Sequence, residues 1–153
     1  MKKDSRCIHS MKNQDPSQEQ LKSVLNLYTH GKLQQALSES SQMLERFPNS
    51  VVLHNISGAS NAALKRFDAA IDSYQQALRI KPDYAEVHNN LGIALKDKGD
   101  LNEAIDSFKQ AIRIKPDYAA AYYNMGVTLK DKGDLNEAID CYKQTIRIRP
   151  DYA

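Results

Sequence analysis

Prolines set a strict period along this chain. They recur every 34 residues, at Pro48, Pro82, Pro116 and Pro150. The twelve residues LKDKGDLNEAID also occur twice at that interval, at 95–106 and 129–140. A fixed period of this length is typical of supersecondary units that stack on one another, because one unit cannot bury its apolar face alone. The chain is therefore expected to fold as a repeat array.

Further columns repeat in step with the prolines. The units 85–118 and 119–152 agree at 23 of 34 places, whereas unit 51–84 is more divergent. The repeated positions are glycine (Gly58, Gly92, Gly126), alanine (Ala70, Ala104, Ala138), aromatic (Tyr74, Phe108, Tyr142) and small (Ala77, Ala111, Thr145). Segment 17–50 keeps the period more loosely, with Val24 and Ser40 where the glycine and the aromatic belong.

Each unit is predicted to form two helices. In 85–118 the first apolar face carries Val87, Leu91, Ala94 and Leu95, and the second carries Leu101, Ala104, Ile105, Phe108, Ala111 and Ile112. Gly99 is placed for a left-handed helix end. Asp83 with Glu86, and Asp100 with Glu103, have the spacing of capping boxes. Small Gly92 and Ala104 would let the two helices approach closely beside bulky Phe108.

These residues resemble the tetratricopeptide repeat (TPR) family, whose 34-residue helix–turn–helix unit has small, alanine, aromatic, alanine and proline positions matching Gly92, Ala104, Phe108, Ala111 and Pro116. The position that is tryptophan in the family's pattern holds His54, His88 and Tyr122. The resemblance implies an all-α protein, an α-solenoid forming a right-handed TPR superhelix of about four helical hairpins. Its first helices would line a concave groove.

The expected organisation follows the period. Residues 1–16 are expected to be a disordered lead, 17–50 a degenerate capping TPR-like hairpin, and 51–84, 85–118 and 119–152 TPR units. An apolar residue pattern persists in the last helix, at Ile139, Ile146 and Ile148, and no polar cap is visible after it. We therefore expect an array that is truncated or continued after residue 153, or an end that packs on another copy.

Charge and hydropathy exclude two classes of partner. The net charge is +2 and no segment carries a basic stripe, so nucleic-acid binding lacks its electrostatic footprint. No apolar run approaches 18 residues, and the first twenty residues lack the apolar core of a secretory signal, so we expect no membrane span. A cytoplasmic location is the resulting expectation.

Cysteine and histidine do not predict a metal site or a cofactor. Cys7 and Cys141 cannot form a ligand cluster, and Cys141 replaces Ser107, which predicts a serine-like surface position. No two histidines have a ligand spacing on one helix, and His54 and His88, one period apart, are expected at half-buried helix interfaces. The KDKGDLNE stretch lacks the alternating ligands of a calcium loop, and motifs for phosphate binding or a nucleophile are absent. We expect no metal, no cofactor and no enzyme activity.

The family's geometry implies which side chains face the groove. The candidate partner-binding residues are Asn55, Glu86, Asn89, Asn90, Ile93, Lys96, Tyr123, Asn124, Val127 and Lys130. Asn90 and Asn124 resemble the asparagine ladder with which some family members hold an extended peptide backbone, since an amide both donates and accepts. The alternative is that they bond to a neighbouring helix or to water. The cations of the family's chaperone-tail clamp are missing, so that ligand is excluded.

Three functions remain open from the sequence. The first is a non-catalytic scaffold that holds a protein or peptide segment in its concave groove. The second is the N-terminal recognition arm of a larger enzyme of glycosyltransferase or sulfotransferase type, because such arrays precede those domains in the family. The third is a self-assembling structural scaffold, joined through its uncapped C-terminal helix.

Overall fold

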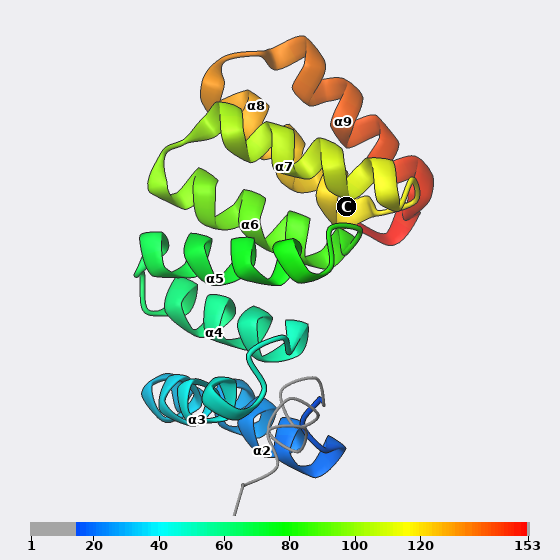
Figure 1. The fold of residues 1–153 in the computed structure, drawn as a ribbon. Coiled ribbons are helices and arrows are strands. Elements are labelled where there is room, and N and C mark those ends of the chain that lie inside the picture. Colours follow the sequence, from blue (N-terminus) through cyan, green and yellow to red (C-terminus); the bar gives the residue numbers. More distant parts are fainter. Residues whose placement is uncertain (1–14, 153) are drawn as a thin grey trace, which may run out of the picture. The chain divides into compact units, whose positions relative to one another are not determined.

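The computed structural model describes residues 15–152, and these contain helices and no strand (Figure 1). The elements are α2 (Gln18–Thr29), α3 (Leu33–Arg46), α4 (Val51–Ala63), α5 (Phe67–Ile80), α6 (Ala85–Lys98), α7 (Leu101–Ile114), α8 (Ala119–Lys132), α9 (Leu135–Ile148) and the short 3-10 helix η1 (Pro150–Tyr152). Helices joined by short turns pack on each other as hairpins. The all-α solenoid class expected from the sequence is confirmed. The chain splits into two compact units, Met1–Lys81 and Pro82–Ala153.

The first unit comprises α2 to α5, and each of these helices packs on its neighbour in the chain. In the α4–α5 hairpin, a Cβ built on Gly58 would lie 2.5 Å from Cε1 of Tyr74. Carbon atoms pack at about 3.5–4.0 Å, so glycine is what permits this approach. In the α2–α3 hairpin the larger side chain of the pair lies on the first helix and the smaller one on the second. Val24 holds the place equivalent to Gly58 and Ser40 the place equivalent to Tyr74, and both are fully buried.

The second unit comprises α6 to α9 and η1, and it repeats the same contact twice. A Cβ on Gly92 of α6 would lie 2.6 Å from Cε1 of Phe108 of α7, and one on Gly126 of α8 would lie 2.8 Å from Cε1 of Tyr142 of α9. Phe108 is fully buried. The expected close approach of the helices beside the aromatic position is therefore present in both hairpins.

Cys141 lies in the core of the second unit and not on its surface. Its side chain is buried in a cluster with Ile105, Leu129 and Ala138, so the expected serine-like surface position is wrong. Ser107, one period earlier, is buried as well, and its hydroxyl donates to the Glu103 carbonyl on its own helix. Ser107 and Cys141 therefore both face a neighbouring helix, where the small thiol of Cys141 packs as an apolar group.

A residue with a left-handed backbone conformation follows the first helix of each hairpin. Gly99 and Gly133 have φ of 103° and 99° at the ends of α6 and α8, as the sequence predicted for Gly99, and Gly31 has φ of 73° after α2. Lys65 holds the equivalent place after α4 and has φ of 59°. A side chain in this region is strained, because its Cβ crowds the following carbonyl oxygen. The turn geometry is therefore kept even where glycine is missing.

The predicted capping boxes are not formed. Helix α6 begins after Tyr84, one residue beyond Asp83, and its N-cap has no side-chain hydrogen bond. Asp100 is the N-cap of α7, but its carboxylate pairs with Lys98 at 3.3 Å and accepts no hydrogen bond from the helix N-terminus. A capping box does occur at the start of α2, where Ser17 and Gln20 bond reciprocally.

Two expectations about domain organisation stay predictions. Residues 1–14, with Cys7 and His9, are not described, so the lead expected at 1–16 stays a prediction. The assignment of separate repeat units to 17–50, 51–84, 85–118 and 119–152 also stays a prediction.

Candidate functional site

Most of the candidate partner-binding residues lie on α6 and α8 of the second unit, two helices that contact each other. Asn55 lies on α4 of the first unit and is half-buried. On α6 and α8, Glu86, Tyr123 and Lys130 are exposed, whereas Asn90, Ile93, Lys96, Asn124 and Val127 are half-buried. The two helices thus place amide, aliphatic and aromatic groups at the same surface, here called the α6/α8 face.

A hydrogen bond across this surface links the two helices. The side-chain N–H of Asn124 on α8 donates to Oδ1 of Asn89 on α6, at 3.1 Å. Asn89 is only 5% exposed, so its side chain orients Asn124 and does not itself face solvent. The sequence left open that Asn124 bonds to a neighbouring helix instead of a ligand, and one of its N–H groups does so. An amide has a second N–H and an oxygen that accepts, so it can still pair with a peptide group.

The apolar part of the α6/α8 face is centred on Tyr123. This side chain is 42% exposed, which is high for an aromatic residue, and its ring centroid lies 6.0 Å from that of Tyr142 on α9 with the planes tilted by 50°. Burial, and then the neighbouring Tyr123, raise the pKa of Tyr142 above its ordinary value. The tilted pair fixes the Tyr123 ring, so an apolar group can bind against it at little cost in side-chain entropy.

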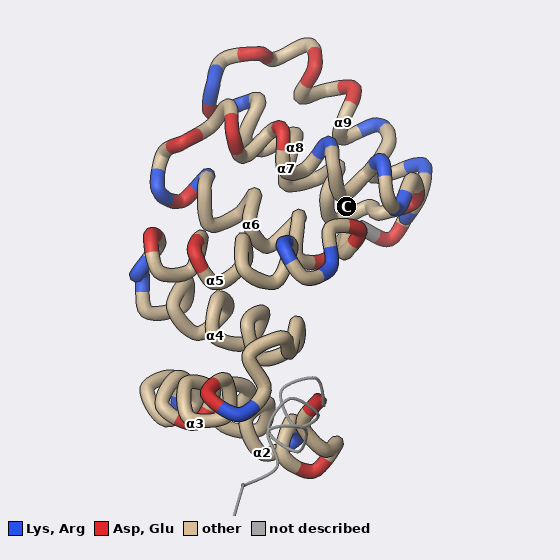
Figure 2. Tube along the Cα trace, in the orientation of Figure 1, with Lys and Arg blue, Asp and Glu red and all other residues tan. Residues whose placement is uncertain are grey.

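Charges on the face are few and of both signs. Lys96 pairs with the adjacent Asp97 at 3.3 Å, and Glu86 lies beside Tyr84, whose pKa is raised first by burial and then by that carboxylate. Along the described helices, Lys and Arg are interspersed with Asp and Glu (Figure 2). This pattern favours a ligand recognised by hydrogen bonds and apolar contacts over one recognised by strong charge.

The two repeated histidines, His54 and His88, each contact the turn before their own helix. Nε2 of His54 lies 2.9 Å from the Pro48 carbonyl oxygen, and Nε2 of His88 lies 2.8 Å from that of Pro82. Each side chain is half-buried and ties the first helix of a hairpin to the turn before it. In residues 15–152, no group of three or more His, Cys, Asp or Glu side chains is placed to hold a metal ion. These histidines therefore have a structural role.

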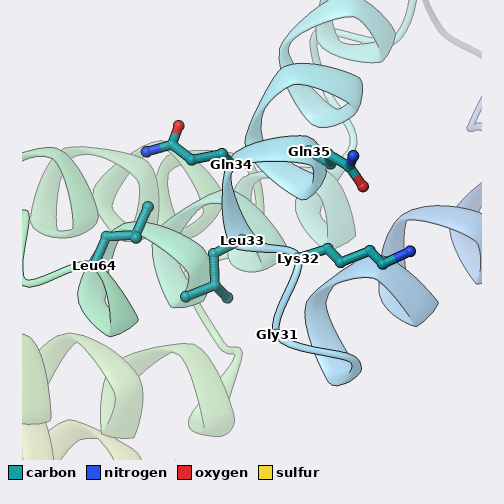
Figure 3. Close-up of a pocket in the computed structure, with 6 residues that line it drawn as sticks. All are labelled: Gly31, Lys32, Leu33, Gln34, Gln35 and Leu64. Atoms are coloured by element: carbon teal, nitrogen blue, oxygen red, sulfur yellow. The ribbon is translucent and has the colours of Figure 1, made fainter.

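Hollows occur elsewhere on the surface. One of about 310 Å³ lies in the first unit, where Leu33 and Leu64 line it with the α2–α3 turn (Figure 3). Another of about 340 Å³ lies between α7 and α9 in the second unit, with Ile105 and Leu129 at its base and charged residues at its rim. Neither of these two hollows includes a predicted binding residue.

Among the described residues, none of the helices is long and apolar enough to cross a membrane. The cytoplasmic location expected from the sequence stays a prediction.

Comparisons with known proteins agree with this architecture. A family model described as TPR repeat matches residues 61–99 and 94–133, and one described as tetratricopeptide repeat matches residues 119–152. The chain matches no curated protein. Solved structures do resemble it. A crystal structure of MamA protein is 25% identical, with 86% of this chain and 72% of that chain covered and a TM-score of 0.79.

Two further structures share the fold at lower identity. MamA from Desulfovibrio magneticus RS-1 is 18% identical over 88% of this chain and 76% of that chain, with a TM-score of 0.80. The pilF protein of Pseudomonas aeruginosa is 20% identical over 86% of this chain and 60% of that chain, also with a TM-score of 0.80. Likeness at these identities extends to the fold alone.

Proposed function

Since the chain belongs to the tetratricopeptide repeat family, we propose that it is a non-enzymatic scaffold that holds an extended segment of a partner protein against the α6/α8 face. The observation that carries this proposal is the hydrogen bond from Asn124 to Asn89, which fixes the Asn124 amide at the surface. A pre-oriented amide loses little side-chain entropy when it pairs with a ligand.

The chemistry of the face fits a peptide backbone. A peptide group offers one donor and one acceptor, and the amides of Asn90 and Asn124, one repeat apart on adjacent first helices, offer both. Backbone pairing of this kind is indifferent to sequence. The exposed ring of Tyr123, with half-buried Val127 beside it on α8, adds a place for an apolar side chain. The proposed ligand is therefore an extended, uncharged segment with at least one apolar residue.

The test uses a synthetic array of random decapeptides, from which the tightest binder is resynthesised and its affinity measured by fluorescence anisotropy. Replacing Asn90 and Asn124 together by alanine removes two hydrogen bonds, each contributing about 0.5–1.5 kcal/mol net. Affinity should fall by roughly 5- to 150-fold. The matched control, Asn49→Ala with Asn102→Ala, changes two exposed asparagines off the face and should leave affinity unchanged.

Either of two results would refute the proposal. One is an array with no peptide bound at micromolar concentration. The other is a peptide whose affinity is the same for the wild type and for the Asn90→Ala/Asn124→Ala variant. Circular dichroism of both variants confirms that they are folded before binding is compared.

A further inference from the structure

The α6/α8 face carries two columns of like side chains, one residue of each column on each helix. Asn90 and Asn124 form the amide column, and Ile93 and Val127 form the aliphatic column. On each helix the amide and the aliphatic residue are three places apart, so they lie side by side on one helical face. A ligand that crosses from α6 to α8 therefore meets an amide and an aliphatic group on each helix.

The packing of a further first helix does not close these columns. Helix α8 packs against α6, yet Asn90 and Ile93 of α6 remain half-buried, as Asn124 and Val127 of α8 are. Asn89, by contrast, is only 5% exposed, because it lies on the side of α6 that α8 covers and accepts the hydrogen bond from Asn124. The two columns thus belong to a side of the hairpins that stays open when hairpins stack.

The spacing of the columns decides which ligand backbone fits them. The Cα atoms of α6 and α8 approach within 8 Å of each other, and packed helices have axes about 8–10 Å apart, so each column recurs after about that distance. A β-strand turns the same side to a surface every two residues, after about 6.6–6.8 Å. A polyproline II helix does so every three residues, after about 9.3 Å. Of the two extended conformations, polyproline II keeps step with the repeat.

A polyproline II segment also presents the groups that the columns need. It has no internal hydrogen bonds, so its carbonyl oxygens can accept from amide N–H groups, and Asn124 has a second N–H besides the one bonded to Asn89. With three residues per turn, every third carbonyl can face the amide column while every third side chain faces the aliphatic column. Proline suits the second position, because its ring is apolar and fixes the extended backbone before binding.

We propose that the ligand of the α6/α8 face is a proline-rich segment in the polyproline II conformation, with proline at every third residue and the proline rings packed on Ile93 and Val127. This inference rests on the proposed function, because it identifies the class of segment that the Asn90 and Asn124 amides hold. A segment of this kind needs no charged residue, in agreement with the few charges of the face.

The test compares two fluorescein-labelled peptides by fluorescence anisotropy with the full chain. The first is (Pro-Gln-Ala)4. The second has the same length and composition, but its prolines stand alternately two and four residues apart, which keeps the proline content and removes the period of three. The first peptide should bind roughly tenfold tighter or more, because in the second one proline ring loses its aliphatic contact.

A near-isosteric substitution tests the aliphatic column. Val127→Thr exchanges a methyl group for a hydroxyl, and should weaken binding of the period-three peptide by about 3- to 10-fold while leaving the second peptide unaffected. Val52→Thr is the matched control, because Val52 lies on α4 of the first unit and is 41% exposed, and it should change neither affinity. Circular dichroism confirms folding, and Ile93→Thr, with the same expected effect, replaces Val127→Thr if that variant is unfolded.

The outcomes separate this inference from the proposed function. Equal affinity for the two peptides, no binding of either at millimolar concentration, or no effect of the aliphatic substitution would overturn the inference. The proposed function would still stand if the peptide selected from the random array depends on Asn90 and Asn124. If that peptide is indifferent to both asparagines, the proposed function fails and this inference fails with it.

Discussion

Replacing Gly92 by alanine tests whether the close approach of α6 and α7 depends on the missing side chain. The added Cβ would lie 2.6 Å from Cε1 of Phe108 and 2.8 Å from its Cδ1 and Cζ. Carbon contacts normally lie at about 3.5–4.0 Å, so the ring or the whole helix must retreat by roughly 1 Å. Phe108 is fully buried and has no empty space into which it can move without disturbing its neighbours.

The magnitude follows from two opposing effects. Overpacking a core costs about 1–3 kcal/mol, and three ring atoms in overlap place Gly92→Ala near the upper end. Alanine is the better helix former by about 1 kcal/mol, which offsets part of that cost. The free energy of unfolding should therefore fall by about 2 kcal/mol, measured by urea denaturation with circular dichroism at 222 nm.

Gly126→Ala is the matched control on α8. Its Cβ would lie 2.8 Å from Cε1 of Tyr142 and 3.2 Å from Cβ of Cys141, but the half-buried Tyr142 ring can move more readily than the fully buried Phe108 ring. The free energy of unfolding should therefore fall by less than for Gly92→Ala, by about 1 kcal/mol. If Gly92→Ala is as stable as the wild type, or if both variants lose the same stability, steric overlap with a fixed ring is not what limits this position.

Two further substitutions follow from the first unit. Lys65→Gly relieves an exposed residue with φ of 59° and should raise the free energy of unfolding by about 1 kcal/mol; an unchanged urea midpoint would argue against strain at this turn. Burial, and then Tyr28, raise the pKa of Tyr74 well above its ordinary 10.0, so above that pH the unfolded chain ionises while the folded chain resists ionisation, and stability should decline as pH rises. Tyr74→Phe, which copies Phe108 one period on, should flatten this decline in urea midpoints measured from about pH 8 to 11.

Helix pairing and helix ends could be predicted from the sequence because they depend on residues close together in one repeat. The approach of Gly92 to Phe108 and the left-handed Gly99 both follow from local spacing and size. The prediction of a capping box at Asp100 was wrong for an equally local reason. Asp100 has a lysine two residues before it, Lys98, and its carboxylate pairs with that cation at 3.3 Å.

The site was harder to predict because it depends on how one hairpin lies on the next. The sequence identified Asn124 as a surface amide, but the burial of Asn89 and the bond between the two follow from the register of α8 on α6. No pattern within one helix encodes that register. The same holds for Cys141. Its alignment with serines in the earlier repeats predicted a surface position, but a neighbouring helix buries it.

The exchanged pair in the first hairpin has a consequence for recombination between repeats. Val24 and Ser40 hold the places equivalent to Gly58 and Tyr74, and the Gly58 position lies against the Tyr74 ring. A gene crossover within a hairpin would combine valine with tyrosine, which clashes, or glycine with serine, which leaves a cavity. A crossover at the proline turns keeps each pair intact. The hairpin, and not the single helix, is thus the part of this chain that evolution or a protein engineer can move as a block.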